Sequence, residues 1–170
     1  GPGLPWDSAR TAEFGGSMPS EVTVSGTVNA NLGINFLQTG TILSGGTLNL
    51  GGASRALNTL DTADSVTVVI DTDLAGTQGV TKSGQGSLII NLPMSYIGGT
   101  DINGGSVIVA GLGSLTGGIG ALGGGDVSVA GGATLLLSNN QAIANDAAVR
   151  LATNGRIDLG FSPGAEEVVG

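Results

Sequence analysis

Few side chains in this sequence could do acid–base or nucleophilic chemistry. The chain has no histidine and no cysteine, so the Ser-His-Asp and Cys-His arrangements of nucleophilic enzymes cannot form. Near the C-terminus, Arg156 and Asp158 are two positions apart and would share one face of a strand, with Arg150 shortly before them. Such a group could act on polysaccharides, but an arginine beside an aspartate is more often a surface ion pair of small energy. We therefore predict a protein that is not an enzyme.

Acidic residues gather in one stretch that could hold a cation. Asp71 and Asp73 alternate on one face at the end of a strand pattern, and Asp61 and Asp64 stand nearby. A Ca²⁺ ion needs several oxygen ligands held together, which two alternating pairs do not guarantee. Solvated corners of the fold explain such charges more often, so we predict no metal site.

Two glycine-rich patterns overlap between Gly117 and Gly123. Residues 118–123 have the G-x-G-x-x-G spacing of dinucleotide sites, but glycine-rich sequence flanks them where a strand and a helix are needed. Residues 117–122 begin like a calcium-binding nonapeptide, but Leu122 stands where an aspartate ligand is required. The sequence therefore predicts no bound cofactor.

The composition is typical of a thin aliphatic core. Of the 170 residues, 33 are glycine, and hydrophobic residues reach 40% although aromatic residues make up only 3%. A core of Val, Ile and Leu with so few rings favours many similar layers over one bulky core. The formal net charge is −8 and the basic residues do not cluster, which excludes nucleic acid as a partner. No apolar run approaches the length of a membrane span, so we expect no direct membrane insertion by this segment.

The first residues differ in character from the rest. The stretch GPGLPWDSARTAEFGGS looks like a protease-site remnant followed by a vector linker, and it lacks the charged start and apolar stretch of a signal peptide. We therefore divide the chain into an expression leader, residues 1–17, and a fragment of a larger protein, residues 18–170.

A short phrase recurs along the chain: a small polar residue followed by apolar residues one and three positions later. Successive phrases begin 20, 20, 20, 19, 28 and 22 positions apart, the last with an arginine in the polar place, at Thr27, Thr47, Thr67, Ser87, Ser106, Thr134 and Arg156. The alternation within each phrase indicates a strand with one face inward. Glycine directly before most phrases is typical of a corner between strands. We expect equivalent strands of successive repeats to lie side by side.

Strands repeated in this way, all running in one direction, form parallel pairs. A parallel connection usually contains a helix, yet only a weak helical pattern is present, at residues 140–151. Connections made of strands and turns give a solenoid instead. We predict an all-β fold, a single-stranded right-handed parallel β-helix of about seven coils, running from about Glu21 to Leu159, with inserted loops at 111–125 and 138–146.

The segment from Gly79 to Val109 carries three sub-motifs in order. They are Thr-Lys-x-Gly-x-Gly-x-Leu, an aromatic residue with x-Gly-Gly-Thr, and Asn-Gly-Gly before a second strand. The matching residues are Thr81, Lys82, Gly84, Gly86, Leu88, Tyr96, Gly98, Gly99, Thr100, Asn103, Gly104, Gly105 and Val107. This segment resembles the autotransporter-associated β-strand repeat of autotransporter passengers. The resemblance implies a parallel β-helix that helps to stabilise or export a secreted passenger. It carries no catalytic residues, and it makes Lys82 a structural or solvated position.

These observations together predict a non-catalytic scaffold or stalk segment of a secreted or surface-displayed bacterial protein, an outer-membrane passenger. An adhesin or glycan-binding module is the alternative, and a polysaccharide-active enzyme is a further one. The expected partners are neighbouring coils of the parent protein and, through open solenoid ends, other copies of the chain. Where identical corners stack, we expect amide contacts at Asn49, Asn91 and Asn103.

Overall fold

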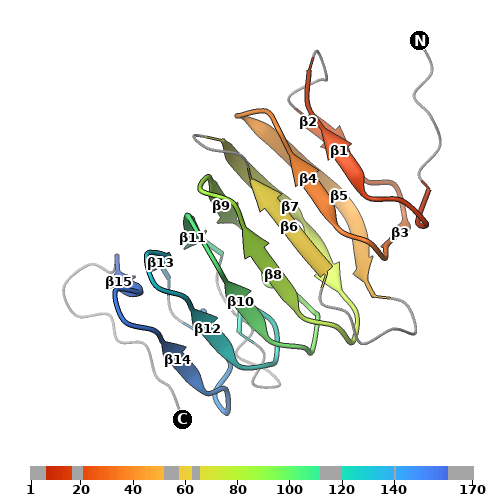
Figure 1. The fold of residues 1–170 in the computed structure, drawn as a ribbon. Helices are drawn as coiled ribbons and strands as arrows, with labels where there is room; N and C mark the ends of the chain where they lie inside the picture. Colours follow the sequence, from red (N-terminus) through yellow and green to blue (C-terminus); the bar gives the residue numbers. More distant parts are fainter. Residues whose placement is uncertain are drawn as a thin grey trace.

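The chain winds into a solenoid of stacked β-strands in the computed structural model (Figure 1), which describes residues 7–16, 21–51, 58–62, 66–111, 120–139 and 141–160. Within these ranges the strands form two sheets. Sheet A has the order β1 (Ala12–Phe14), β4 (Ile34–Phe36), β6 (Asn58–Thr62), β8 (Val80–Ser83), β10 (Thr100–Ile102), β12 (Val127–Val129) and β14 (Val149–Leu151). Sheet B has the order β15 (Arg156–Leu159), β13 (Thr134–Leu137), β11 (Ser106–Val109), β9 (Ser87–Ile90), β7 (Thr67–Ala75), β5 (Thr41–Leu50) and β2 (Glu21–Thr23), and β3 (Thr27–Ala30) also pairs with β5.

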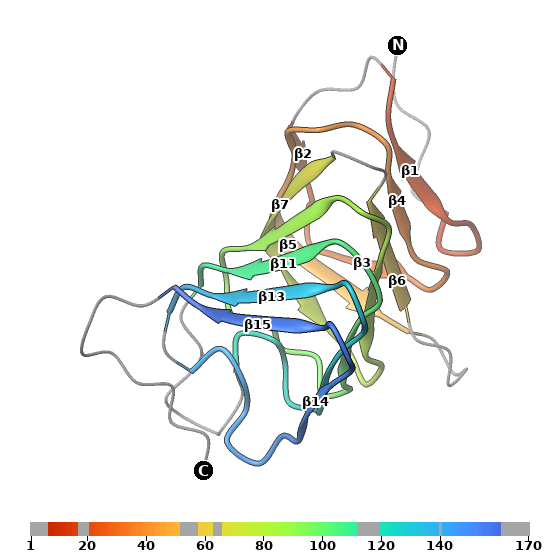
Figure 2. The same cartoon turned by 60° about the vertical axis from the view of Figure 1, so that its left-hand side comes forward.

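Each coil contributes one strand to sheet A and, after a short corner, one to sheet B. Figure 2 shows strands of sheet B stacked one above another toward β15. The pairings between these strands are parallel. The predicted all-β fold of stacked parallel coils is therefore confirmed, with about six turns rather than seven.

The recurring phrase produces this stack because alternate residues of a strand point to opposite faces. In β9, β11 and β13 the apolar residues one and three positions after the first are buried: Leu88, Ile90, Val107, Val109, Leu135 and Leu137. The register places these residues directly beside one another, Leu88 next to Val107 and Val107 next to Leu135. The aliphatic core is thus a set of columns running along the solenoid axis.

One step of the predicted repeat is wrong. Thr47 pairs with Asp73, not with Thr67, and the carbonyl of Thr67 accepts a hydrogen bond from the backbone N–H of Gly40. The strands involved are long, and the pairing of β5 with β7 shifts register between Ser44 and Thr47. β7 therefore alternates inward and outward residues over its whole length, and the sequence spacing had matched Thr47 to its first half instead of its second.

The solenoid also begins earlier than predicted, at Ala12 rather than at about Glu21. β1 pairs in parallel with β4, and the ring of Phe14 stacks on that of Phe36 with centroids 5.6 Å apart. Phe14 is buried because it covers the first apolar layer. Residues 12–14 thus belong to the fold, and the vector origin of residues 1–17 stays a prediction.

A third side of the solenoid consists of irregular segments that hydrogen-bond through their backbones. The N–H groups of Ser95 and Tyr96 donate to the carbonyl of Leu74, and the N–H of Gly124 donates to the carbonyl of Tyr96. The N–H of Leu122 donates in turn to the carbonyl of Ala142. This side, which we call the third wall, is formed by residues 74–76, 94–97, 121–124 and 141–144.

The two predicted loops are corrected in one respect: their later parts form part of the third wall. Residues 112–119 and 140 lie outside the described residues, but Leu122 and Ile143, from the later parts of both loops, are buried core residues. The weak helical pattern at 140–151 does not give a helix over the described residues 141–151, and its last three residues form β14. Bulky apolar side chains in these stretches close the core where sheets A and B do not.

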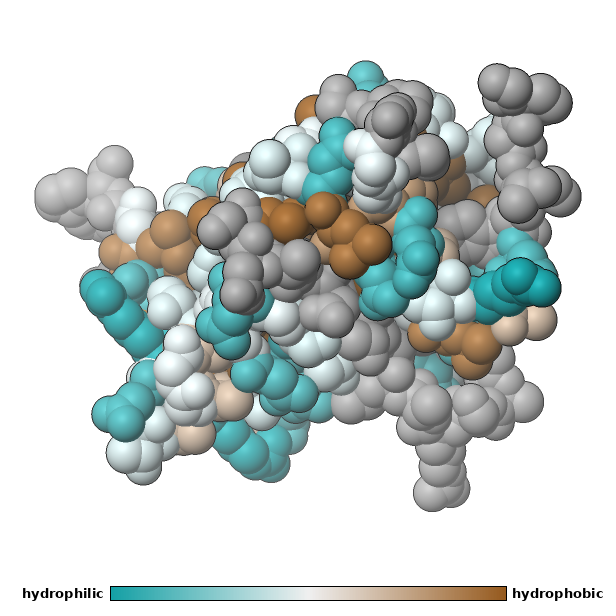
Figure 3. All heavy atoms as spheres, turned by 45° about the horizontal axis from the view of Figure 1, so that its top comes forward, coloured by the Kyte–Doolittle hydropathy of each residue, from teal (hydrophilic) through white to brown (hydrophobic). Residues whose placement is uncertain are grey.

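The outer face of sheet B carries two aligned rows. One contains hydroxyl groups, at Thr67, Ser87, Ser106 and Thr134, and the other contains half-buried aliphatic side chains, at Ile42, Val69, Ile89, Ile108 and Leu136. The hydroxyls of Ser87 and Ser106 are 2.8 Å apart. Figure 3 shows one long face of the molecule, where apolar residues gather in a band along the solenoid. Within the described ranges no helix is long and apolar enough to cross a membrane.

Candidate functional site: the repeat motif

The motif residues lie on two adjacent coils, from β8 to β11. Five have side chains buried in the interior: Lys82, Leu88, Tyr96, Thr100 and Val107. Two face outward: Thr81 on β8 and Asn103 at the next corner. The remaining six are glycines where backbones of neighbouring coils or segments approach closely: Gly84, Gly86, Gly98, Gly99, Gly104 and Gly105. The motif is thus assembled by the stacking of one coil on the next.

Lys82 is fully buried, which corrects the expectation of a solvated lysine. Its side chain lies inside the corner between sheets A and B. Its Nζ donates to the carbonyls of Ser83 and Gly84, both at 2.9 Å, and to that of Gly104 at 3.1 Å. The first two acceptors belong to its own corner and the third to the corner of the next coil. The ammonium therefore ties two coils together, and the carbonyl dipoles compensate part of the cost of burying it.

The neighbours of Lys82 in sheet A make this position unusual. The parallel register puts Leu60 on one side of Lys82 and Ile102 on the other, and Val129 follows Ile102. Lys82 is thus a charged side chain in line with the buried aliphatic side chains of Ile102 and Val129. Alternation within β8 directs Val80 and Lys82 to the same buried face.

Tyr96 makes a second buried polar link. Its hydroxyl lies 2.5 Å from Oγ1 of Thr100, and Thr100 Oγ1 donates to the carbonyl of Leu122 at 3.1 Å. Because a threonine hydroxyl has one proton to give, the tyrosine hydroxyl is the donor in the first bond. The chain of bonds connects the third wall to β10 and to the following coil.

Burial raises the pKa of Tyr96 far above its ordinary value, and the hydrogen bond with Thr100 offsets only part of this shift. The folded protein therefore keeps the phenol proton where the unfolded chain releases it, above about pH 10. We expect the contribution of Tyr96 to stability to be constant up to about pH 10 and to fall above it. Tyr96 is the chain's single tyrosine, so tyrosinate absorbance reports this residue alone. The absorbance should rise only with unfolding, and Tyr96→Phe should remove this contribution to the alkaline loss. A tyrosinate signal near pH 10 with intact strand circular dichroism would contradict the expectation.

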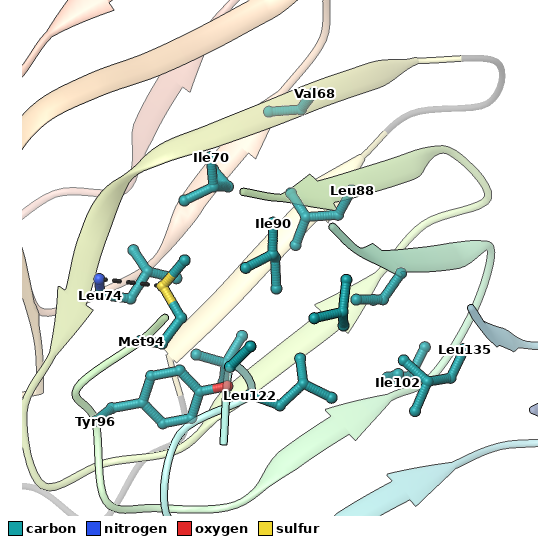
Figure 4. Packing of buried hydrophobic residues seen from close by; sticks show 14 of the residues in the cluster. Val68, Ile70, Leu74, Leu88, Ile90, Met94, Tyr96, Ile102, Leu122 and Leu135 are labelled. Atoms are coloured by element: carbon teal, nitrogen blue, oxygen red, sulfur yellow. Dashed lines mark hydrogen bonds between the residues drawn. The ribbon is translucent and has the colours of Figure 1, made fainter. Parts of the chain in front are cut away.

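The interior of the third wall was missed by sequence reasoning. Figure 4 shows Met94 and Tyr96 directed into the core between Leu74 and Leu122, with the backbone N–H of Leu74 hydrogen-bonded to the sulfur of Met94 at 3.3 Å. The signal that could have found these residues is the alternation of buried Met94, exposed Ser95 and buried Tyr96. It spans only three residues and lies outside the recurring phrase.

The charged residues considered for chemistry form surface ion pairs. Arg156 Nε contacts Asp158 Oδ1 at 2.6 Å, and both side chains keep substantial exposure. Arg150 binds Asp126 instead, also at 2.6 Å. The backbone N–H of Ala148 and then the Arg150 guanidinium lower the pKa of Asp126. Such exposed pairs contribute little to stability, and they do not converge on a shared substrate position.

The acidic and glycine-rich patterns assemble no ligand site among the described residues. Asp71 and Asp73 share the outer face of β7, as predicted, and Asp73 accepts hydrogen bonds from the backbone N–H and hydroxyl of Ser95. Asp64 lies outside the described residues. No group of three or more acidic side chains that could hold a metal occurs in the described part of the chain.

The pattern with dinucleotide-site spacing, residues 118–123, ends in a turn, where a dinucleotide site requires the start of a helix. Its described end, residues 120–123, forms a tight bridge between Gly120 and Gly123. An amide contact of the expected type is present at Asn49, whose Nδ2 donates to Oδ1 of Asn29 one coil earlier at 2.8 Å.

The stacked parallel coils form a β-solenoid, which confirms the resemblance of the sequence to an autotransporter passenger repeat. Over 111 residues, or 64% of the chain, the sequence is 37% identical to the adhesin BmaC autotransporter of Brucella suis biovar 1 (strain 1330). The chain spans only 3% of the length of that relative. No family model and no solved structure matches the chain.

Proposed function

We propose that this segment is a non-catalytic scaffold in the passenger of a surface-displayed autotransporter adhesin. The observation that carries the proposal is the placement of the motif side chains. Lys82, Tyr96 and Thr100 point inward and join neighbouring coils, and Leu88 and Val107 fill the core between them. A motif whose larger side chains lie mostly in the interior contributes folding energy and shape.

Similarity to an adhesin also supports a second function, in which this segment itself contacts a glycan or a host protein. The surface that could do so is the outer face of sheet A, where Thr81, Asp101 and Ser128 lie side by side in register. These side chains are partly exposed and polar. A scaffold tolerates changes in this row, whereas a binding face does not.

The experiment compares an outer and an inner change in the full-length parent displayed on cells. The outer variant is Thr81→Ala, Asp101→Ala and Ser128→Ala together. The inner variant is Leu135→Ala, which removes a buried side chain from the β11–β13–β15 column at a cost of about 2–5 kcal/mol. Surface antibody labelling measures display, and cell adherence measures binding.

For a scaffold, the outer variant keeps normal display and adherence per displayed molecule, and the inner variant lowers display. Normal display of the outer variant with lost adherence would instead assign binding to this segment. The isolated chain should give no signal on a glycan array and no turnover of polysaccharides.

We also propose that neighbouring coils of the parent protein are the partners of the last described coil. Val149, Leu151 and Leu159 of β14 and β15 expose 39%, 53% and 61% of their surface. Apolar side chains at this position continue the columns of the core, so a further coil would cover them, as it would in any stacked repeat.

A further inference from the structure

The aliphatic columns of this solenoid do not by themselves specify how one coil is aligned on the next. Leu88 and Ile90 face Val107 and Val109 in the native register. A slip of two residues keeps every inward side chain inward, because the side-chain period of a strand is two. It again places aliphatic groups on aliphatic groups. Slipped stacking is therefore the competing structure that such a repeat must exclude.

We infer that the buried ammonium of Lys82 selects the native register between the coil of β8 and β9 and the coil of β10 and β11. The inference deepens the proposed scaffold function, on which its biological meaning rests. Lys82 Nζ is a buried charged group whose bonding depends on this alignment. Two of its acceptors belong to its own coil and the third, the Gly104 carbonyl, belongs to the next. A two-residue slip moves Gly104 away and takes that acceptor from a buried charge.

The surroundings of Lys82 support this role over a purely stabilising one. Ile102 beside it and Val129 beyond are buried and aliphatic, so we expect an apolar side chain of similar length to fit the position. Replacing a buried charge by a well-packed apolar group is often neutral or stabilising. A lysine kept in such a column is thus explained by specificity, in the way that one buried polar residue fixes the register of a coiled coil.

The test uses engineered disulfides to report the register in the isolated chain, which contains no native cysteine. Cysteines at Ser87 and Ser106 lie opposite each other in the native register. Cysteines at Ser87 and Ile108, or at Ile89 and Ser106, meet only after a two-residue slip. In the native alignment their Cα atoms are about 8 Å apart, too far for a disulfide. Each pair is refolded from denaturant under oxidising conditions, and the cross-linked fraction is measured.

With Lys82 present, only the 87–106 pair should cross-link efficiently. In Lys82→Met the protein should keep its strand circular dichroism, and the slipped pairs should cross-link roughly tenfold more than with Lys82, which is the discrimination expected from one hydrogen bond to a charged group. The matched control is Ile102→Met, which introduces the same side chain at the neighbouring position of the column and keeps the lysine. It should leave the slipped pairs at their low level.

Two outcomes overturn the inference. Slipped cross-links in Lys82→Met that are no more frequent than in Ile102→Met would show that the lysine does not select the register. Loss of folding in both Lys82→Met and Lys82→Leu would show that the ammonium is needed for stability. Neither result bears on display or adherence of the parent, so this test and that of the scaffold function can fail separately.

Discussion

Leu88→Asp is expected to unfold the middle of the solenoid, whereas Ile89→Asp, one residue away on the same strand, is expected to leave it folded. Leu88 is buried, and in sheet B its register partners are Val68 and Val107. Removing the leucine side chain alone costs about 2–5 kcal/mol. The aspartate adds a buried charge without a partner, and the two costs together approach or exceed a total stability of about 5–15 kcal/mol.

Ile89 is the matched control because it is aliphatic, half-exposed and on the outer face of β9. An aspartate there stays in water, and only its contacts with Val69 and Ile108 are lost, so we expect a change of about 1 kcal/mol or less. Urea denaturation followed by circular dichroism measures both variants. Equal loss of stability in the two variants would mean that the inward and outward faces of β9 are assigned incorrectly.

The parts of the fold that follow a strict two-residue alternation could be predicted from the sequence. The phrases at Ser87, Ser106 and Thr134 each place two aliphatic residues in the core, and the register aligns them as expected. The same rule applied to Val80 and Lys82 would have placed the lysine inside. The usual exposure of charged residues argued against it, and the three carbonyls that accept hydrogen bonds from its ammonium group could not be read from the sequence.

The remaining errors arose where the pairing is decided by tertiary contacts. β7 alternates inward and outward residues over nine positions, so the pattern alone does not say which half of it lies beside Thr47. The pairing of Thr41 with Val68 places Thr47 beside the second half, and the irregularity after Ser44 makes Asp73 its partner. Apart from the end of β7, the third wall has no regular strand, and its buried Leu122 and Ile143 lie in glycine- and alanine-rich stretches that are typical of loops. β1 was set aside because of its neighbours in sequence, although Phe14 finds a partner in Phe36.

Gly105→Ala is expected to be strongly destabilising, because two independent costs fall on this position. Gly105 has φ of +60°, where an L-residue is strained. A methyl group at this position would lie 2.2 Å from the carbonyl oxygen of Gly86 and 2.7 Å from that of Gln85, which are backbone atoms of the previous coil. These atoms cannot move without separating the corner that also holds Lys82.

Substitutions at two other glycines measure the backbone strain and the steric clash separately. Gly132 has φ of +82°, and a methyl group there would have nothing within 4 Å, so Gly132→Ala measures strain alone, at about 1–2 kcal/mol. Gly98 lies outside the positive-φ region, but a methyl group would lie 2.3 Å from the backbone nitrogen of Gly79, so Gly98→Ala measures the steric clash. Gly105→Ala should lose more than either, above about 4 kcal/mol in denaturant titrations. If Gly105→Ala lost no more stability than Gly132→Ala, the neighbouring coils would have to be farther apart at this corner than the structure places them. The motif glycines would then be needed for their backbone angles and not for the close contact of one coil with the next.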